Sequence, residues 1–168
     1  MNNGTDANDL GVDLPQVRLD LERYAPEFVL AIAHLDQAAT KELDAADIDR
    51  RLRELVRIRA SQINGCAYCV DMHTKDARAI GESEQRLYAL PVWREAPFFD
   101  DRERAALAYT DAVTLLAGDP EPTEVYRQVA AQFRPEEVAA LLSLIVTINA
   151  WNALSVTTRA WVPGSYEP

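Results

Sequence analysis

Apolar side chains recur at helical spacing along most of this chain. Pro26 is suited to the first turn of a helix, and Phe28, Ile32 and Leu35 then follow one face up to about Ala39. No segment alternates apolar and polar residues with the period of two that a half-buried strand requires. The pattern therefore predicts an all-helical protein.

Capping residues and breakers divide the rest of the chain into further helices. Asp47, Ser83, Asp101 and Thr123 are predicted caps, while glycines 65, 81 and 118 are predicted to end helices. The predicted helices run over residues 26–39, 47–63, 66–80, 83–90, 101–117, 123–133 and from 135 onward, and Pro163-Gly164 is predicted to end the ordered chain. Residues 92–100 read as an ordered aromatic loop. We expect six to eight helices in a single domain spanning residues 1–168, with residues 1–13 flexible.

The last predicted helix contains an uncharged stretch, residues 138–156, that is close to the length of a membrane span. Polar residues interrupt it at Ser143, Thr147, Asn149, Asn152 and Ser155. This composition favours a helix buried inside a protein or at a subunit interface over a transmembrane helix. Because a monomer of this size cannot cover so many apolar faces, we expect a homo-oligomer.

Composition and charge limit the partners. The 168 residues are 48% apolar and 26% charged, which is typical of a globular protein. A net charge of -10 argues against nucleic acid and anionic membranes as partners, because both are negatively charged. The amino terminus, MNNGTDANDLGVD, lacks the basic and apolar regions of a secretory signal, so we expect a cytoplasmic protein.

Both cysteines and one of the two histidines lie within eight residues of each other. At 100° per residue, Cys66, Cys69 and His73 share one face of the helix predicted to begin at Cys66. The opposite face, which carries Asp71 and Lys75, is expected to be solvated. A bridge between cysteines two residues apart closes almost no loop, so this pair is expected to serve chemistry rather than stability.

These residue types suit thiol redox chemistry. The amino terminus of a helix favours the thiolate, which is the form that attacks, and His73 lies one turn from Cys69, where it can accept a proton. Glu54 lies at the edge of the preceding helix's apolar stripe, half-sheltered, and is the best candidate to orient His73. Arg59 falls in the middle of that stripe, which predicts a buried ion pair. Residues 47–80 thus form the predicted redox core.

The spacing from Glu54 to Cys66, Cys69 and His73, in the context SQINGCAYCVDMH, resembles the alkyl hydroperoxidase D-like members of the carboxymuconolactone decarboxylase superfamily. INAWN, residues 148–152, resembles the end of that domain, and the resemblance covers most of residues 50–161. It implies an all-helical fold assembled as trimers or hexamers, and a peroxidase with neither metal nor flavin cofactor.

The resemblance also implies individual roles. Cys69 would attack the peroxide, Cys66 would be the more exposed thiol that resolves the intermediate and meets the reductant, and Glu54 and His73 would relay protons. Tyr68 stands where the best-known peroxidase of the family has a histidine.

Simpler interpretations compete at each position. The cysteines could bind zinc with both histidines, His34 included, or could only pack in the core. Glu54 could be a surface partner of Arg50, Arg51 or Arg57. Tyr68 projects away from the redox face in the helical projection, which suggests a subunit contact, and Trp151 and Trp161 read as core or interface aromatics.

Three functions follow from these residues. The first is a peroxidase that reduces hydrogen peroxide or organic hydroperoxides with electrons from a thiol or dithiol reductant, such as a lipoyl- or thioredoxin-like protein. The second is a dithiol–disulfide exchange protein or redox sensor. The third is a lactone decarboxylase, whose reaction has no need of a CxxC pair.

Overall fold

The protein is all-helical, as predicted. The computed structural model describes residues 17–118 and 123–168, and these residues contain eight α-helices, one 3-10 turn and no strand. The elements are α1 (Leu21–Tyr24), α2 (Pro26–Ala45), α3 (Arg50–Asn64), α4 (Ala67–Ala79), α5 (Glu84–Ala89), η2 (Leu90–Val92), α6 (Asp101–Thr114), α7 (Thr123–Gln132) and α8 (Pro135–Thr158). The predicted flexible segment 1–13 lies outside the described residues.

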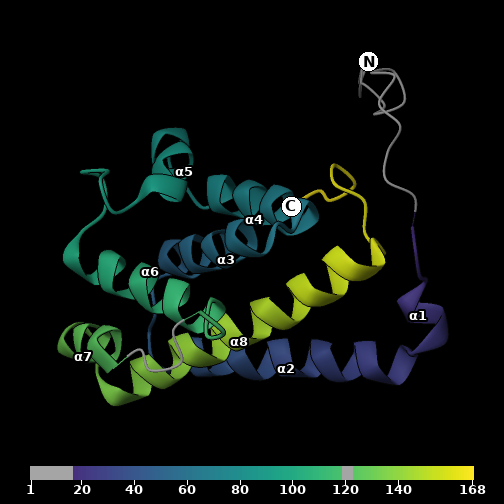
Figure 1. Cartoon of the computed structure of the whole chain (residues 1–168), viewed down its shortest axis with the longest axis horizontal. Coiled ribbons are helices and arrows are strands. Elements are labelled where there is room, and N and C mark those ends of the chain that lie inside the picture. The colour runs from purple at the N-terminus through teal and green to yellow at the C-terminus, as the bar shows by residue number, and fades with distance from the viewer. Residues whose placement is uncertain (1–16, 119–122) are drawn as a thin grey trace.

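The long helix α8 organises the fold. It packs against both α2 and α3, and α3 in turn contacts α4 and α6 (Figure 1). Among the described residues, α8 is the one helix that is long and apolar enough to cross a membrane. However, half of its most apolar stretch is buried inside the protein. Its contacts with helices on two sides explain the long uncharged stretch without a membrane.

Two predicted helix starts are wrong by one or two residues. Asp47 lies in the turn before α3 with φ 54°, whereas Asp49 caps the helix by accepting bonds from the backbone N–H groups of residues 51 and 52. Likewise Asp100, not Asp101, accepts the Glu103 N–H at the start of α6. In each case two aspartates lie one or two residues apart, and local pattern does not distinguish which of them caps the helix.

The helix ends differ more. Gly65 and Gly81 take left-handed backbone conformations after α3 and α4, as predicted. However, α2 continues to Ala45, six residues beyond the prediction, and α6 ends at Thr114 rather than at residue 117. Helix α8 ends at Thr158, where Arg159 adopts φ 50°.

The ion pair predicted for Arg59 is confirmed. Its guanidinium donates two hydrogen bonds to the Asp111 carboxylate on α6, at 2.6 and 3.2 Å. Asp111 is buried and also accepts from Arg94 and Trp93. The aromatic loop is therefore ordered as expected, and this cluster fixes α3 against α6.

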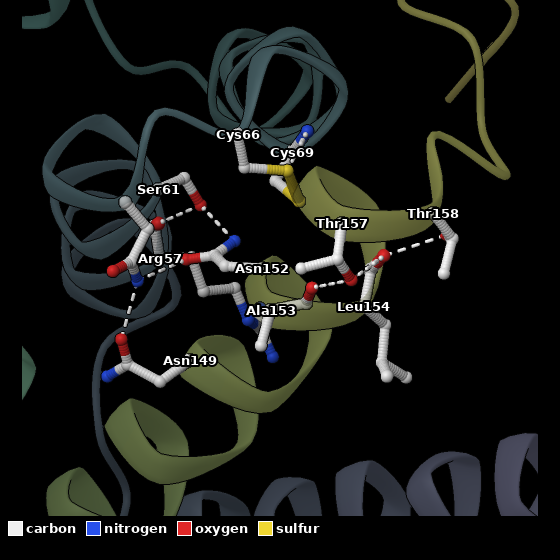
Figure 2. Close-up of a disulfide and its surroundings, with 11 residues drawn as sticks. Arg57, Ser61, Cys66, Cys69, Asn149, Asn152, Ala153, Leu154, Thr157 and Thr158 are labelled. Carbon is white, nitrogen blue, oxygen red and sulfur yellow. Dashed lines mark hydrogen bonds between the residues drawn. A yellow bond between two sulfur atoms is a disulfide. The ribbon is translucent and has the colours of Figure 1, made fainter. Parts of the chain in front are cut away.

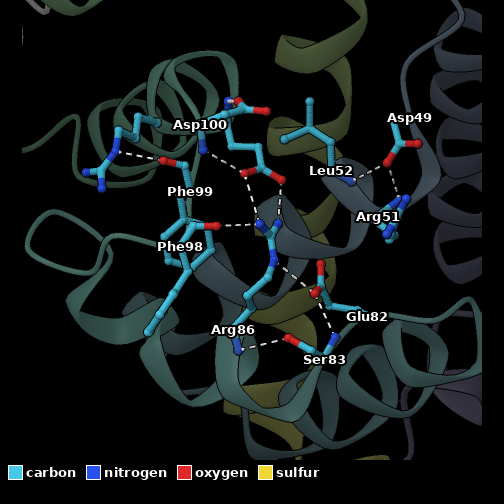
Figure 3. A network of polar contacts seen from close by, with 11 residues as sticks. Asp49, Arg51, Leu52, Glu82, Ser83, Arg86, Phe98, Phe99 and Asp100 are labelled. Carbon is cyan, nitrogen blue, oxygen red and sulfur yellow. Dashed lines mark hydrogen bonds and ion pairs between the residues drawn. The ribbon is translucent and has the colours of Figure 1, made fainter.

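A second polar network joins α5 to α6. Arg86 donates hydrogen bonds to Glu82 at 2.9 Å, to the Phe98 carbonyl oxygen and to Glu103 (Figure 3). Asp100, the cap residue before α6, donates its backbone N–H to Glu103, so the network holds the carboxy-terminal end of the aromatic loop. These contacts lie outside the predicted redox core.

Glu137, in the first turn of α8, is expected to make the protein less stable to unfolding as the pH is lowered into the acid range. Burial raises its pKa, but hydrogen bonds from the Arg134 N–H and the Arg102 guanidinium outweigh this and hold the pKa at about 2. Since the unfolded value is 4.5, the stabilisation is complete above pH 4.5 and is lost as pH falls toward 2.

We expect about 1–3 kcal/mol of unfolding free energy to disappear over that range. Urea unfolding at pH 5 and pH 3 measures it. Glu137→Gln should flatten the decrease, while Glu136→Gln, an exposed neighbour, should not. An equal decrease in wild type and Glu137→Gln would contradict the assignment.

Candidate functional site

The two cysteines begin α4. Cys66 is its cap residue, and its sulfur accepts the backbone N–H of Cys69 at 3.2 Å. The left-handed turn at Gly65 brings the chain from α3 into α4 at this point. The two cysteines form a disulfide, with their Cα atoms 5.3 Å apart (Figure 2). The dithiol is thus close enough to cycle between reduced and bridged forms.

Both cysteines are buried, which corrects the expectation that one of them is exposed. Cys66, predicted to be the more exposed thiol, is 1% exposed, and Cys69 is 3% exposed. Cys69 lines a cavity of about 450 Å³, whereas Cys66 lines a different pocket of about 260 Å³. Access to the disulfide therefore passes through these two openings.

Glu54 and His73 meet beside the cysteines. Glu54 is 7% exposed, more buried than the half-sheltered position expected for it, and its Oε2 lies 3.0 Å from His73 Nδ1. Its other oxygen accepts from Arg57, one of the partners that the surface interpretation proposed. The carboxylate thus has both partners and is not a surface group.

The charge of Glu54 follows from these contacts. Burial, the largest influence, raises its pKa, but the hydrogen bond from His73 and the charge of Arg57 together leave the pKa below the usual 4.5. Glu54 is therefore ionised at neutral pH and can only accept hydrogen bonds. His73 must carry its hydrogen on Nδ1, which leaves Nε2 as the nitrogen able to accept a proton.

Two residues extend this chain of contacts. Asp76, one turn after His73, has a carboxylate oxygen 4.0 Å from His73 Nδ1, and it accepts the Tyr166 hydroxyl at 2.8 Å. This bond to Asp76, with burial, raises the pKa of Tyr166 to about 12. His73 thus has two carboxylates on one side of its ring.

The carboxy-terminal segment covers α4, which the sequence did not predict. Pro163-Gly164 does not end the ordered chain: the Gly164 N–H donates to Asp71 at 2.9 Å, and Lys75 donates to the Tyr166 carbonyl oxygen at 2.9 Å. Asp71 and Lys75 were expected to be solvated, yet both are half-buried. A helical projection shows which residues share a face but not which distant segment covers it.

A buried amide network ties α3 to α8 just before the turn into α4. Asn152, fully buried, donates to the Ser61 hydroxyl at 3.0 Å and accepts from Asn64, which also donates to Asn149 at 2.6 Å (Figure 2). From the sequence, the asparagines of α8 were interpreted only as polar interruptions of an apolar helix. The INAWN segment was the signal that could have shown this role.

Aromatic side chains form much of the larger cavity's wall. Trp151 and Trp161 meet edge to face at 5.7 Å, and Tyr68 lies 6.1 Å from Trp161. All three line the cavity, together with Met72 and Ile148. Tyr68 therefore does not project away from the redox site, and the two tryptophans are cavity residues rather than core residues.

The residues proposed as zinc ligands do not lie close together in the structure. Within residues 17–118 and 123–168, the group with metal-ligand spacing is Glu54, His73 and Asp76, whose ligand atoms lie within 4.8 Å of one another. It contains neither cysteine, and His34 is exposed on α2. Arg57 and His73 already occupy the Glu54 oxygens, so this trio is better described as a hydrogen-bonded cluster.

The geometry can be compared with known proteins. A model of the carboxymuconolactone decarboxylase family matches residues 26–112, a range that includes Glu54, both cysteines and His73. The chain is 40% identical over 139 residues to an uncharacterised protein, YdfG of Bacillus subtilis, covering 83% of this chain and 92% of that one. The chain belongs to the carboxymuconolactone decarboxylase family.

Similar solved structures show which branch of the family this chain resembles. ATU0492 of Agrobacterium tumefaciens, described as a protein of unknown function and a candidate antioxidant defence protein AhpD, is 35% identical, with a TM-score of 0.80 over 91% of this chain and 99% of that one. A peroxidase-related protein from Silicibacter sp. TM1040 is 21% identical, with a TM-score of 0.72 over 87% and 76%, and shows the fold alone. This carboxymuconolactone decarboxylase family member is alkyl hydroperoxidase D-like, as its motif predicted.

Proposed function

We propose that the protein is a thiol-dependent peroxidase. The observation that carries the proposal is that Cys69 of the CxxC disulfide and His73, which is hydrogen-bonded to the ionised Glu54, line one cavity. A reactive thiol needs a base, a sheltered substrate pocket and a second thiol, and each has a candidate here. The disulfide supports a redox role more directly than the lactone decarboxylation in the family's name, which has no use for it.

The reaction starts from the reduced dithiol. His73 accepts the proton of Cys69, and the Glu54 carboxylate stabilises the imidazolium that forms. The Cys69 thiolate attacks one peroxide oxygen, the O–O bond breaks, and the leaving alkoxide or hydroxide takes up a proton. The resulting sulfenic acid is attacked by Cys66, which forms the disulfide and releases water. A thiol reductant then supplies two electrons to restore both thiols.

The assignment of Cys69 as the attacking thiol rests on the cavity. Cys69 and His73 both line the opening of about 450 Å³, while Cys66 does not. The aromatic and aliphatic wall of this cavity suits the carbon part of an organic hydroperoxide, and the cavity also has room for hydrogen peroxide. Exchange with a protein partner is less well supported, because a bulky partner cannot reach sulfurs as buried as these.

Peroxide consumption by the reduced protein tests the proposal. We expect the dithiol form, freed of reductant, to consume one equivalent of cumene hydroperoxide or hydrogen peroxide and to return to the disulfide. Continuous turnover is expected once dithiothreitol is added. A reduced protein that leaves both peroxides unchanged would contradict the proposal. Because the dithiol must be regenerated, we also propose a reducing, cytoplasmic location.

We further propose that the protein assembles as a trimer or hexamer. Both α2 and α8 carry exposed apolar residues, among them Phe28 and Val146, which are 52% and 48% exposed. Light scattering after size-exclusion chromatography measures the mass, and Val146→Asp should shift it toward the monomer. Val92→Asp, which changes another exposed valine, should not. A monomeric wild type would contradict the proposal.

A further inference from the structure

The disulfide can be approached from two sides that differ in shape and charge. Cys69 faces the larger cavity, and Cys66 faces the pocket of about 260 Å³. Tyr68, Ser155 and Trp161 line both, so they form the partition between them. A molecule in the smaller pocket thus meets the sulfur that the proposed peroxide reaction leaves on the far side.

The two openings carry opposite charge. Among the described residues that line them, the larger cavity has the carboxylates of Glu22, Asp36 and Asp76 and the guanidinium of Arg57. The smaller pocket has the guanidiniums of Arg18 and Arg159 and no carboxylate. The protein has a net charge of -10, yet the described residues that line this pocket include two cations and no acid, so the local charge is opposite in sign to that of the whole protein.

The backbone holds the two arginines next to each other. The N–H groups of Arg18 and Leu19 donate to the Thr158 carbonyl oxygen at 2.8 and 3.2 Å, which places Arg18 beside the end of α8. Arg159 is the residue directly after Thr158. It has a left-handed backbone conformation, and its N–H donates to the Ser155 carbonyl oxygen. Both exposed side chains therefore leave the backbone at one point on the rim of the Cys66 pocket.

We propose that this pocket binds the small thiol reductant and that Arg18 and Arg159 select thiols carrying a carboxylate. The inference rests on the proposed function, since it assigns the electron donor for the same disulfide. A reductant thiolate attacks the Cys66 sulfur, forming a mixed disulfide and releasing Cys69 as a thiolate that takes up a proton. The reductant's second thiol then displaces Cys66, so two electrons and two protons pass to the protein and the reductant leaves as its own disulfide.

The size of the pocket decides between possible donors. At about 260 Å³ it lies just below the range usual for drug-sized ligands, so it suits a thiol of a few carbon atoms rather than a protein surface. The charge of the two arginines then favours a small thiol that carries a carboxylate. A carboxylate near two guanidiniums is attracted, although the net charge of -10 repels it from the protein as a whole.

Two dithiols that differ only in charge provide the test. Dihydrolipoate carries a carboxylate and dihydrolipoamide carries a neutral amide at the same position. The disulfide protein, without any peroxide, is mixed with each at low ionic strength, and reduction is followed by alkylation and mass spectrometry. We expect dihydrolipoate to reduce the wild type about three- to tenfold faster, although the net charge of the protein alone favours the amide.

Variants locate the effect. Arg18→Gln and Arg159→Gln should each lower the dihydrolipoate rate about two- to fivefold and leave the dihydrolipoamide rate unchanged. Arg127→Gln, on α7, removes the same charge from another exposed site and should change neither. High salt should remove the preference in the wild type.

The inference is overturned if dihydrolipoamide reduces the wild type as fast as dihydrolipoate, if neither dithiol reduces the disulfide, or if the double arginine variant keeps the preference. The dihydrolipoamide rate of each variant shows whether its disulfide remains accessible. Because no peroxide is present, a protein that fails to consume peroxide can still show the preference. The two proposals therefore fail separately.

Discussion

Replacing Cys69 with serine is expected to lower peroxide consumption by about a thousandfold or more. A serine hydroxyl remains protonated at neutral pH and cannot form a sulfenic acid, so no reaction of the proposed cycle can begin. The measurement is the loss of cumene hydroperoxide in the presence of excess dithiothreitol. A rate equal to that of the wild type would remove Cys69 from the reaction.

Cys66→Ser is the matched control, because it deletes the other sulfur of the same disulfide. We expect this variant to react once, to accumulate a sulfenic acid on Cys69, and then to turn over slowly, since no second thiol is adjacent. A sulfenic-acid-specific reagent with mass spectrometry detects the intermediate. If Cys66→Ser abolished the first reaction and Cys69→Ser preserved it, the two roles would be reversed.

Replacing Glu54 with glutamine is expected to lower the peroxide rate about a hundredfold. A neutral amide cannot stabilise the imidazolium of His73, and it can donate to Nδ1 and so select the wrong tautomer. Arg57 also loses its charged partner at the edge of the cavity. The apparent pKa of the reactive thiol should rise, because its base is weaker.

The rate of iodoacetamide alkylation against pH measures that pKa. In the wild type the pKa of Glu54 lies below 4.5, so the carboxylate stays charged across the neutral range and its own titration affects the profile only in acid. Glu84→Gln changes an exposed carboxylate on α5 and should leave the profile unaltered. An identical profile for Glu54→Gln and wild type would reduce Glu54 to a structural residue.

Local pattern was sufficient for the parts of the site that lie close together in the chain. Cys69 and His73 lie one turn apart on α4 and Cys66 is the cap of this helix, so helical periodicity alone was enough to bring the three together. Glu54 is on the preceding helix, joined by the single turn at Gly65, and the family spacing supported its inclusion. The ion pair of Arg59 was predicted on energetic grounds, although its partner Asp111 lies 52 residues away.

Other features depend on segments far apart in sequence. Asn152 reaches Ser61 across 91 residues, and Tyr166 reaches Asp76 across 90. The carboxy-terminal segment buries a face of α4 that was expected to be solvated, and Trp161 makes Tyr68 a cavity residue. The burial of Cys66 is part of the same outcome, since nothing in the CxxC spacing indicates what packs over its sulfur.

The sequence by itself determined that this protein is all-helical, that its two thiols and imidazole lie on one helical face, and that a carboxylate is available beside them. The first two follow from local periodicity, which acts over one or two turns, whereas the carboxylate was assigned from the spacing that the chain shares with the family. Only the tertiary structure decided that the disulfide is buried between two openings of opposite charge. That depends on which distant segments cover α4, and such contacts are set by the packing of the whole chain.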